Sequence, residues 1–373
     1  MTKDPRAVVR VAAPPVLLTA ALRPRARLGE RGTALTALIA LWSWTYARYR
    51  RRGRARTAHE FELMQTATPE AFRRHYNESV PTIEEELDIW SDYHAVRHEM
   101  RYDLVADVVR DLVPDGGTIV DIGCGAALVA DRLADLPVTY VGLEYGGHQL
   151  KFAVDKSRQD HTNPIRRWFM QGDAEKLPIA SASVDVVVMS EVIEHLLRPD
   201  HAVWEIARIL RPGGALVMTT NNASEMPLRS PLSDPFAWLE KALGFRRDSL
   251  ISERPWVWPE PVGVAQLPDG SEQAVFLPHT WHKQAETRRM FAAAGLETES
   301  ATTFEFPPPQ SKTARWLSDR GKAGTATVDV VEAVCTRLPL VNRLGCHVFM
   351  VARRATREVP KRPRGIWPGP FSD

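Results

Sequence analysis

The sequence predicts an α/β fold: a doubly wound, seven-stranded and mostly parallel sheet with helices on both faces. From residue 118 onward, short apolar runs that end in Gly or Asp alternate with segments of helical character. This alternation is typical of parallel strands that are joined by helices. The expected strands cover 118–123, 139–144, 168–173, 184–190, 215–221, 297–306 and 346–352.

The remaining segments predict the organisation around this sheet. N-terminal helices are expected over 57–115, with apolar side chains at helical spacing from Asp92 to Leu112. The ligand-binding core covers 116–222, and 279–355 completes the domain with helices near 282–294 and 328–336. Residues 223–278 are rich in Pro and Trp and too long for an ordinary connection, so they predict an inserted lid. The Pro-rich segment 356–373 is expected to be a disordered tail.

The charge is distributed unevenly along the chain. Residues 1–56 carry 13 Lys and Arg against 2 Asp and Glu, whereas the formal net charge of the whole chain is only +2. The body of the protein is therefore mildly acidic, which does not fit a general nucleic-acid binder. The basic arm suits contact with an anionic partner, such as a membrane surface or another protein.

One uncharged apolar stretch, residues 32–47, lies within this arm. It is shorter than the roughly 20 residues that span a bilayer. Trp42 and Trp44 beside the Arg-rich run 48–56 favour an interfacial helix, so residues 32–56 are expected to make a peripheral membrane contact. A helix packed on the catalytic domain and an organelle transit peptide are the alternatives.

The three cysteines, Cys124, Cys335 and Cys346, are widely scattered and form no CxxC pair. An odd and sparse set gives no disulfide framework, so a reducing cytoplasm is the expected compartment.

A glycine turn follows the first expected strand, in the segment VDIGCGAA (120–127). Gly123 and Gly125 allow the backbone to come close to a ligand at a strand-to-helix turn. Asp121 stands directly before this turn, where a carboxylate suits a cationic, amino-acid-bearing ligand better than a pyrophosphate. The third glycine of a GxGxxG dinucleotide motif is missing, because position 128 is Leu.

Two further acidic residues end the next two strands. Glu144 stands 19 residues after Gly125, where its carboxylate can accept hydrogen bonds from both hydroxyls of a ribose. Asp173, in QGDAEKLP, can accept one from an adenine amino group. Ligands of parallel sheets bind at the carboxyl ends of the strands, so these acidic side chains are expected to lie along one site.

This ordered set resembles the cofactor motifs of class I S-adenosylmethionine (SAM)-dependent methyltransferases, which have a Rossmann-like fold. The resemblance continues through ARILRPGGALVMTTNN (207–222), and the nearest group comprises small-molecule and quinone methyltransferases. Ala127 departs from the pattern, since many members have a third Gly there. The resemblance implies SAM as the cofactor, bound by Asp121, Gly123, Gly125, Glu144, Asp173, Ala174 and Ser190.

The segment SEVIEHL (190–196) follows the fourth strand and is the main candidate for chemistry. On a helix, Glu191, Glu194 and His195 would share one face and could bind Mg²⁺ or another divalent cation. This ExxEH pattern resembles the metal site of small-RNA 2′-O-methyltransferases and of some quinone-pathway O-methyltransferases. The downstream segment WHKQAETR (281–288) is similar to one in those RNA enzymes, which makes His282 the fourth ligand, with His279 as the alternative.

Without a metal, His195 is the candidate general acid or base, or the segment is purely structural. The leading hypothesis is methylation of a hydroxyl or carbon of a small, lipophilic acceptor. The alternatives are a metal-dependent RNA 2′-O-methyltransferase, a non-catalytic SAM-binding scaffold at a membrane and, more distantly, a nicotinamide dehydrogenase. No NPPY-type segment follows the fourth strand, which argues against N-methylation of nucleic-acid bases.

Overall fold

The chain divides into two compact units, Met1–Ala55 and Arg56–Asp373. The computed structural model describes residues 40, 43, 44, 47, 76, 77, 92–159, 165–222, 256–266, 270, 272–306, 316, 320–338, 341–343, 345–355 and 358–362.

In the first unit the four described residues are helical, and the side chain of Trp44 is exposed. Most of the expected interfacial segment 32–56 lies outside the described residues, so the membrane contact stays a prediction. Among the helices that the structure describes, none combines the length and the apolar character that crossing a bilayer requires.

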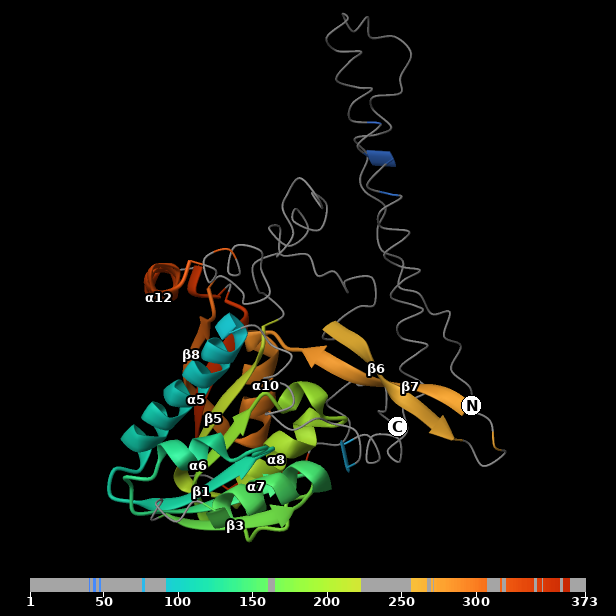
Figure 1. Cartoon of the computed structure of the whole chain (residues 1–373). Helices are drawn as coiled ribbons and strands as arrows, with labels where there is room; N and C mark the ends of the chain where they lie inside the picture. The colour runs from blue at the N-terminus through green and yellow to red at the C-terminus, as the bar shows by residue number, and fades with distance from the viewer. Residues whose placement is uncertain are drawn as a thin grey trace, which may run out of the picture. The chain divides into compact units, whose positions relative to one another are not determined.

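A seven-stranded sheet forms the centre of the second unit (Figure 1). Its strands are β1 (Gly117–Ile122), β2 (Val138–Glu144), β3 (Arg166–Gln171), β4 (Val184–Ser190), β5 (Leu210–Asn221), β8 (Leu296–Phe304) and β9 (His347–Arg354). They lie in the order β3-β2-β1-β4-β5-β9-β8, and β9 alone runs in the opposite direction to the other strands of this sheet. The predicted doubly wound, mostly parallel fold is confirmed.

Helices cover both faces of this sheet. They are α5 (Asp92–Leu112), α6 (Leu128–Arg132), α7 (Gly147–Gln159), α8 (Pro199–Ile209), α10 (Gln284–Ala294) and α12 (Lys322–Arg337). Successive side chains of a strand point to opposite faces. Along β4, Val187 therefore packs in one core cluster with Ile206 of α8, while Val188 packs in the other with Val109 of α5. Burial on both faces explains why the strands read as continuous apolar runs.

Local sequence fixes where two of the helices begin. Pro199 occupies the first position of α8, where its fixed φ suits a helix and its missing N–H costs no hydrogen bond. At the start of α10, the side chain of Glu286 accepts a hydrogen bond from the backbone N–H of Lys283 at 3.2 Å. A short 3₁₀ turn, η1 (Ile193–His195), follows β4, and a second, η3 (Val341–Arg343), precedes β9.

The predicted insertion contains a β-hairpin. Strands β6 (Trp256–Gln266) and β7 (Glu272–Trp281) pair antiparallel and extend away from the central sheet (Figure 1). Strand β7 continues beyond the expected boundary at 278, and a bridge between His282 and Asn222 ties its end to the end of β5. The rest of the insertion, 223–255, lies outside the described residues, so its role as a lid stays a prediction.

Part of the C-terminal segment differs from the expected disordered tail. The indole N–H of Trp204 on α8 donates a hydrogen bond to the carbonyl of Pro360 at 2.7 Å. Arg362 donates one to the carbonyl of Glu175 at 2.9 Å, and Val359 packs against the core. An apolar anchor and two hydrogen bonds therefore hold residues 358–362 in place, while 363–373 lie outside the described residues.

Candidate active site

The glycine turn connects β1 to α6 at the carboxyl edge of the sheet. Gly123 has a φ of +69°, and a Cβ placed there would lie 2.4 Å from a methyl carbon of Val192. Protein packing therefore requires glycine at this position. Among the described residues the space above Gly125 is open, since their nearest atom to a Cβ there is an oxygen of Gln149 at 3.9 Å. This open space is where a ligand can approach the backbone.

The structure shows why many members of the resembling family have glycine where this chain has Ala127. This residue is buried, precedes α6 and has a left-handed φ of +56°. An L-residue in this conformation is strained by roughly 1–2 kcal/mol, whereas glycine is not. The chain therefore keeps the backbone shape of the turn without the residue that suits it best.

Asp121 lies near the end of β1 and is buried. Its carboxylate accepts a hydrogen bond from the hydroxyl of Tyr140 on β2 at 2.6 Å. Burial raises the pKa of this carboxyl to about 7; the hydrogen bond from Tyr140 opposes the rise, and the negative charge of Glu144 adds to it. Near neutral pH, a cationic group beside Asp121 would stabilise its ionised form.

Glu144 ends β2 and is also buried. One carboxylate oxygen accepts a hydrogen bond from the N–H of Gly125 at 3.0 Å. The other accepts from the N–H groups of Tyr145 at 2.8 Å and Gly146 at 3.0 Å. Burial raises the pKa of Glu144, and these three hydrogen bonds oppose the rise. The carboxylate thus ties the glycine turn to the turn after β2.

Asp173 follows β3, and its carboxylate accepts a hydrogen bond from the N–H of Glu175 at 2.8 Å. This bond and a backbone bridge to Lys176 fix a tight turn in which Ala174 is buried. Because β3, β2 and β1 are neighbours in the sheet, Asp173, Glu144 and Asp121 line one edge in that order. The arrangement expected from the sequence is present.

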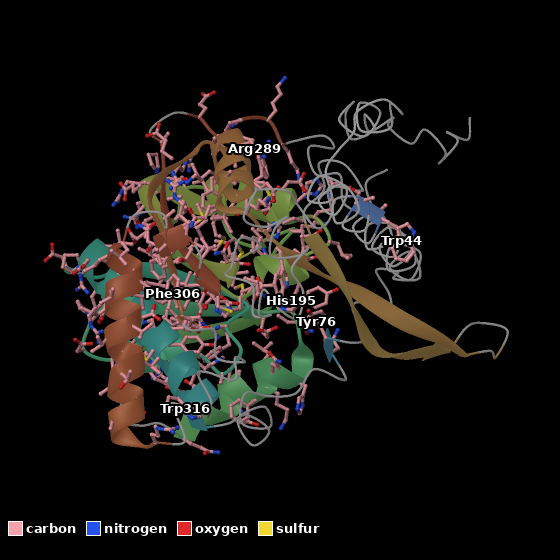
Figure 2. All side chains as sticks on the ribbon, turned by 90° about the horizontal axis from the view of Figure 1, so that it is seen from above. Trp44, Tyr76, His195, Arg289, Phe306 and Trp316 are labelled. Carbon is pink, nitrogen blue, oxygen red and sulfur yellow. The ribbon has the colours of Figure 1, made fainter. Side chains whose placement is uncertain are left out.

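A segment from the N-terminal half of the chain reaches this edge, which the sequence did not indicate. The side-chain oxygen of Asn77 accepts hydrogen bonds from the N–H of Gly147 at 2.9 Å and from Gln171 at 2.8 Å. The ring of Tyr76 lies edge-on to those of Tyr145 and His195, with centroid distances of 6.1 and 6.3 Å. Figure 2 shows Tyr76 and His195 side by side. Tyr76 therefore bridges the ends of β2 and β4.

The segment after β4 is a 3₁₀ turn of three residues rather than the expected helix with Glu191, Glu194 and His195 on one face. Glu191 precedes it with a left-handed φ of +54°, and its N–H donates to the carbonyl of Thr219. Ser190 ends β4, and its hydroxyl lies 2.8 Å from that of Thr219. The carboxylate of Glu191 faces His347 at the start of β9, whereas the ring of His195 contacts Tyr76.

Among the described residues, no three of the predicted metal ligands lie close enough to share an ion, although the carboxyl groups of Glu191 and Glu194 interact with each other. Glu194 is buried and accepts hydrogen bonds from the hydroxyl of Thr220 at 2.9 Å and the amide of Asn221 at 3.3 Å. Burial and the adjacent charge of Glu191 raise the pKa of Glu194 well above its usual value. His282 is buried where β7 leads into α10. In the described part of the chain, the groups close enough to share a metal ion are instead Glu305, Cys346 and His347.

His347, at the start of β9, lies between two carboxylates. Its Nδ1 is 2.8 Å from an oxygen of Glu305, and its Nε2 is 3.2 Å from one of Glu191. Burial acts to lower the pKa of His347, but the two carboxylates raise it well above its usual value. Burial acts to raise the pKa of Glu191, but His347 and Arg101, 3.8 Å away on α5, hold it below its usual value. Neither His347 nor Glu305 was indicated by a sequence motif.

The comparisons with known proteins agree with this geometry. Residues 120–218 match the family model described as a methyltransferase domain. A probable SAM-dependent methyltransferase of Mycolicibacterium smegmatis is 38% identical over 122 residues, which are 32% of this chain and 45% of the relative. A ubiquinone biosynthesis O-methyltransferase of Agrobacterium fabrum is 32% identical over 108 residues, 29% of this chain and 42% of the relative. The matched segment thus spans less than half of either relative.

A solved structure of a SAM-dependent methyltransferase from Methanosarcina mazei covers 67% of this chain and 98% of its own, at 15% identity and a TM-score of 0.43. The strand order, the glycine turn, the acidic strand ends and the matching family model together define the class. Residues 120–218 accordingly form a SAM-dependent methyltransferase domain.

The strain at Ala127 predicts that Ala127→Gly stabilises the protein by about 1 kcal/mol, because the folded backbone is already left-handed. Urea unfolding measures this difference. The control Ala130→Gly, within helix α6, should instead destabilise by about 1 kcal/mol. Loss of stability in Ala127→Gly would show that the turn does not have this conformation.

Proposed function

We propose that this protein transfers the methyl group of SAM to a hydroxyl or carbon atom of a small, lipophilic acceptor. One observation carries the proposal: three acidic side chains stand at the carboxyl ends of three adjoining strands, beside a glycine turn above which the described residues leave open space. SAM has three parts, an amino-acid end, a ribose and an adenine, and each part can face one of the three acidic side chains.

Each position suits its part of the ligand. Asp121 pairs with the ammonium group, which favours the ionised form of its carboxyl. Glu144 already accepts three hydrogen bonds, but a carboxylate has about four acceptor sites, so it can still accept from the ribose. Asp173 and the buried Ala174 border the adenine, and Gly123, Gly125 and Ser190 line the amino-acid end.

His195 is the proposed general base, which removes the hydroxyl proton of the substrate that is methylated. Methyl transfer from a sulfonium is an in-line displacement, so positioning and removal of a hydroxyl proton are the main contributions the protein can make. His195 follows β4, beside the strand that carries Asp121. Its ring lies against that of Tyr76, which also contacts Tyr145 on the cofactor side. These contacts support a position for the imidazole near the end of the cofactor that carries the methyl group.

A small, lipophilic acceptor is supported by the name of the Agrobacterium fabrum relative, which connects it with O-methylation in ubiquinone biosynthesis. The RNA alternative depends on Glu191, Glu194, His195 and His282 holding Mg²⁺ together, and the described structure does not gather these four side chains. The alternative of a non-catalytic SAM-binding scaffold predicts the same cofactor binding but no methyl transfer.

Binding of S-adenosylhomocysteine tests the cofactor site. Isothermal titration should give micromolar affinity at pH 8, and affinity should fall by up to tenfold per pH unit below about pH 7. The reason is that Asp121, whose pKa is about 7, must be ionised to pair with the ammonium group. Asp121→Asn should bind weakly and with a smaller pH dependence. The exposed Asp107→Asn should behave as the wild type.

If Asp121→Asn bound as tightly as the wild type, the cofactor assignment would be wrong. Absence of binding by the folded wild type would remove the proposed function altogether.

His195→Ala should lower kcat by about 10²–10⁴-fold for a hydroxyl acceptor and leave binding of S-adenosylhomocysteine unchanged. Transfer of labelled methyl from SAM to a panel of catechols and hydroquinones measures the rate. Tyr76→Phe keeps the ring contact and serves as the control, with a change of only a few fold. Full activity of His195→Ala would assign the proton acceptor to another group.

A further inference from the structure

A second group of buried, chemically reactive side chains lies at the carboxyl edge of the sheet, at the ends of β8 and β9. Strand β9 runs antiparallel, so its first residues lie beside the last residues of β5 and β8: His347 is paired with Asn221 and with Phe304. Glu305 directly follows β8, and Cys346 directly precedes β9. These side chains come from segments some 40 residues apart, and the sheet topology brings them together.

The three side chains have the chemistry of a metal site. One ligand atom each from Glu305, Cys346 and His347 lies within 4.8 Å of the other two, and all three residues are buried. A carboxylate, a thiolate and an imidazole are the ligand types that Zn²⁺ takes in proteins. Hard cations such as Mg²⁺ prefer oxygen ligands, so the set discriminates against them.

The backbone around these residues is constrained. The N–H of Cys346 donates to the carbonyl of Glu305, and that of Gly345 donates to the hydroxyl of Thr303 at 2.9 Å. A Cβ on Gly345 would lie 2.5 Å from the carbonyl oxygen of Phe304, so only glycine allows the two segments to come this close. Close approach of these segments is what places Cys346 beside Glu305.

Glu305 itself has a strained, left-handed φ of +65°. The carboxylate of Glu332 on α12 sustains this conformation by accepting hydrogen bonds from the N–H groups of Glu305 and Phe306, at 2.9 and 2.6 Å. Glu191 on the other side of His347 is strained in the same way. Backbone strain at two residues around one histidine is typical of functional sites rather than of ordinary packing.

His347 is oriented as a ligand histidine would be. Its Nδ1 faces Glu305, while a carboxylate oxygen of Glu191 lies 3.2 Å from its Nε2. In protein metal sites, a carboxylate on the second nitrogen fixes the tautomer and the orientation of the ring that binds the metal. Glu191 meets this requirement, and Arg101 pairs with its other oxygen.

From these observations we propose that Glu305, Cys346 and His347 bind a Zn²⁺ ion, with Glu191 as the carboxylate that orients His347. Tetrahedral zinc separates a nitrogen and an oxygen ligand by about 3.3 Å, given metal–ligand bonds of about 2.0–2.2 Å. The present distance of 2.8 Å between His347 and Glu305 therefore needs only a small opening. Zinc replaces the proton that these two groups share and the proton of the thiol.

Three protein ligands leave the fourth position of a tetrahedral ion for water or a substrate oxygen. The site differs from the cluster that the sequence predicted, because Glu191 acts on a ligand instead of binding the metal, and Glu194 and His195 take no part. The inference does not depend on the proposed methyl transfer.

Titration of the metal-free full-length protein with Co²⁺ tests the proposal, because cobalt replaces zinc and reports a thiolate ligand through a charge-transfer band in the near ultraviolet. The wild type should show this band at one equivalent, and Zn²⁺ should remove it. Cys346→Ser should abolish the band, whereas the control Cys335→Ser, on α12, should keep it. Glu191→Gln should weaken binding by about 10–100-fold.

Absence of the band in the wild type would overturn the proposal, and so would its persistence in Cys346→Ser. Loss of Co²⁺ binding in Glu194→Gln and His195→Ala but not in Cys346→Ser would assign the metal to the cluster after β4 instead. Circular dichroism and S-adenosylhomocysteine binding confirm that each variant is folded, and failure of the proposed methyl transfer would leave the cobalt result unchanged.

Discussion

The rest of the site depends on the buried carboxylate of Glu144. It accepts hydrogen bonds from backbone N–H groups of the glycine turn after β1 and of the turn after β2, so one side chain fixes the relative positions of two ligand-binding turns. Buried N–H groups need acceptors, and bonds to a charged acceptor are the strongest available. The cradle next to Asp121 is therefore formed before a ligand binds, which lowers the conformational cost of binding.

The carboxyl edge of the sheet has two parts with different electrostatics. At β1 and β2, carboxylates stand without a cationic side chain among their described contacts, and burial raises the pKa values of Asp121 and Glu144. At β4, β8 and β9, carboxylates alternate with cationic groups, and ion pairs hold the pKa of Glu191 low. A cationic ligand is favoured in the first part. In the second part the charges of the carboxylates and the cationic groups offset each other, and the proposed metal ion would take the place of protons there.

Sequence patterns predicted the features that local rules determine. The strands, helix α5, the glycine turn and the acidic strand ends follow from apolar periodicity and from single residues beside it. Tyr76, Glu305 and His347 were not predicted, because they reach the edge from distant segments and have no local motif. The turn after β4 was misassigned as a helix, since nothing in SEVIEHL signals the left-handed backbone of Glu191. The contact between Pro360 and Trp204 is likewise a tertiary interaction inside a segment of disordered composition.

The most direct test of the preformed cradle around Glu144 is a crystal structure of the protein with S-adenosylhomocysteine. The ligand should cross the ends of β1, β2 and β3, with its ammonium group near Asp121, its ribose on Glu144 and its adenine beside Asp173 and Ala174. The sulfur should lie toward Ser190 and His195. A ligand bound elsewhere, or one that displaces the hydrogen bonds between Glu144 and the glycine turn, would contradict the claim that this cradle is preformed.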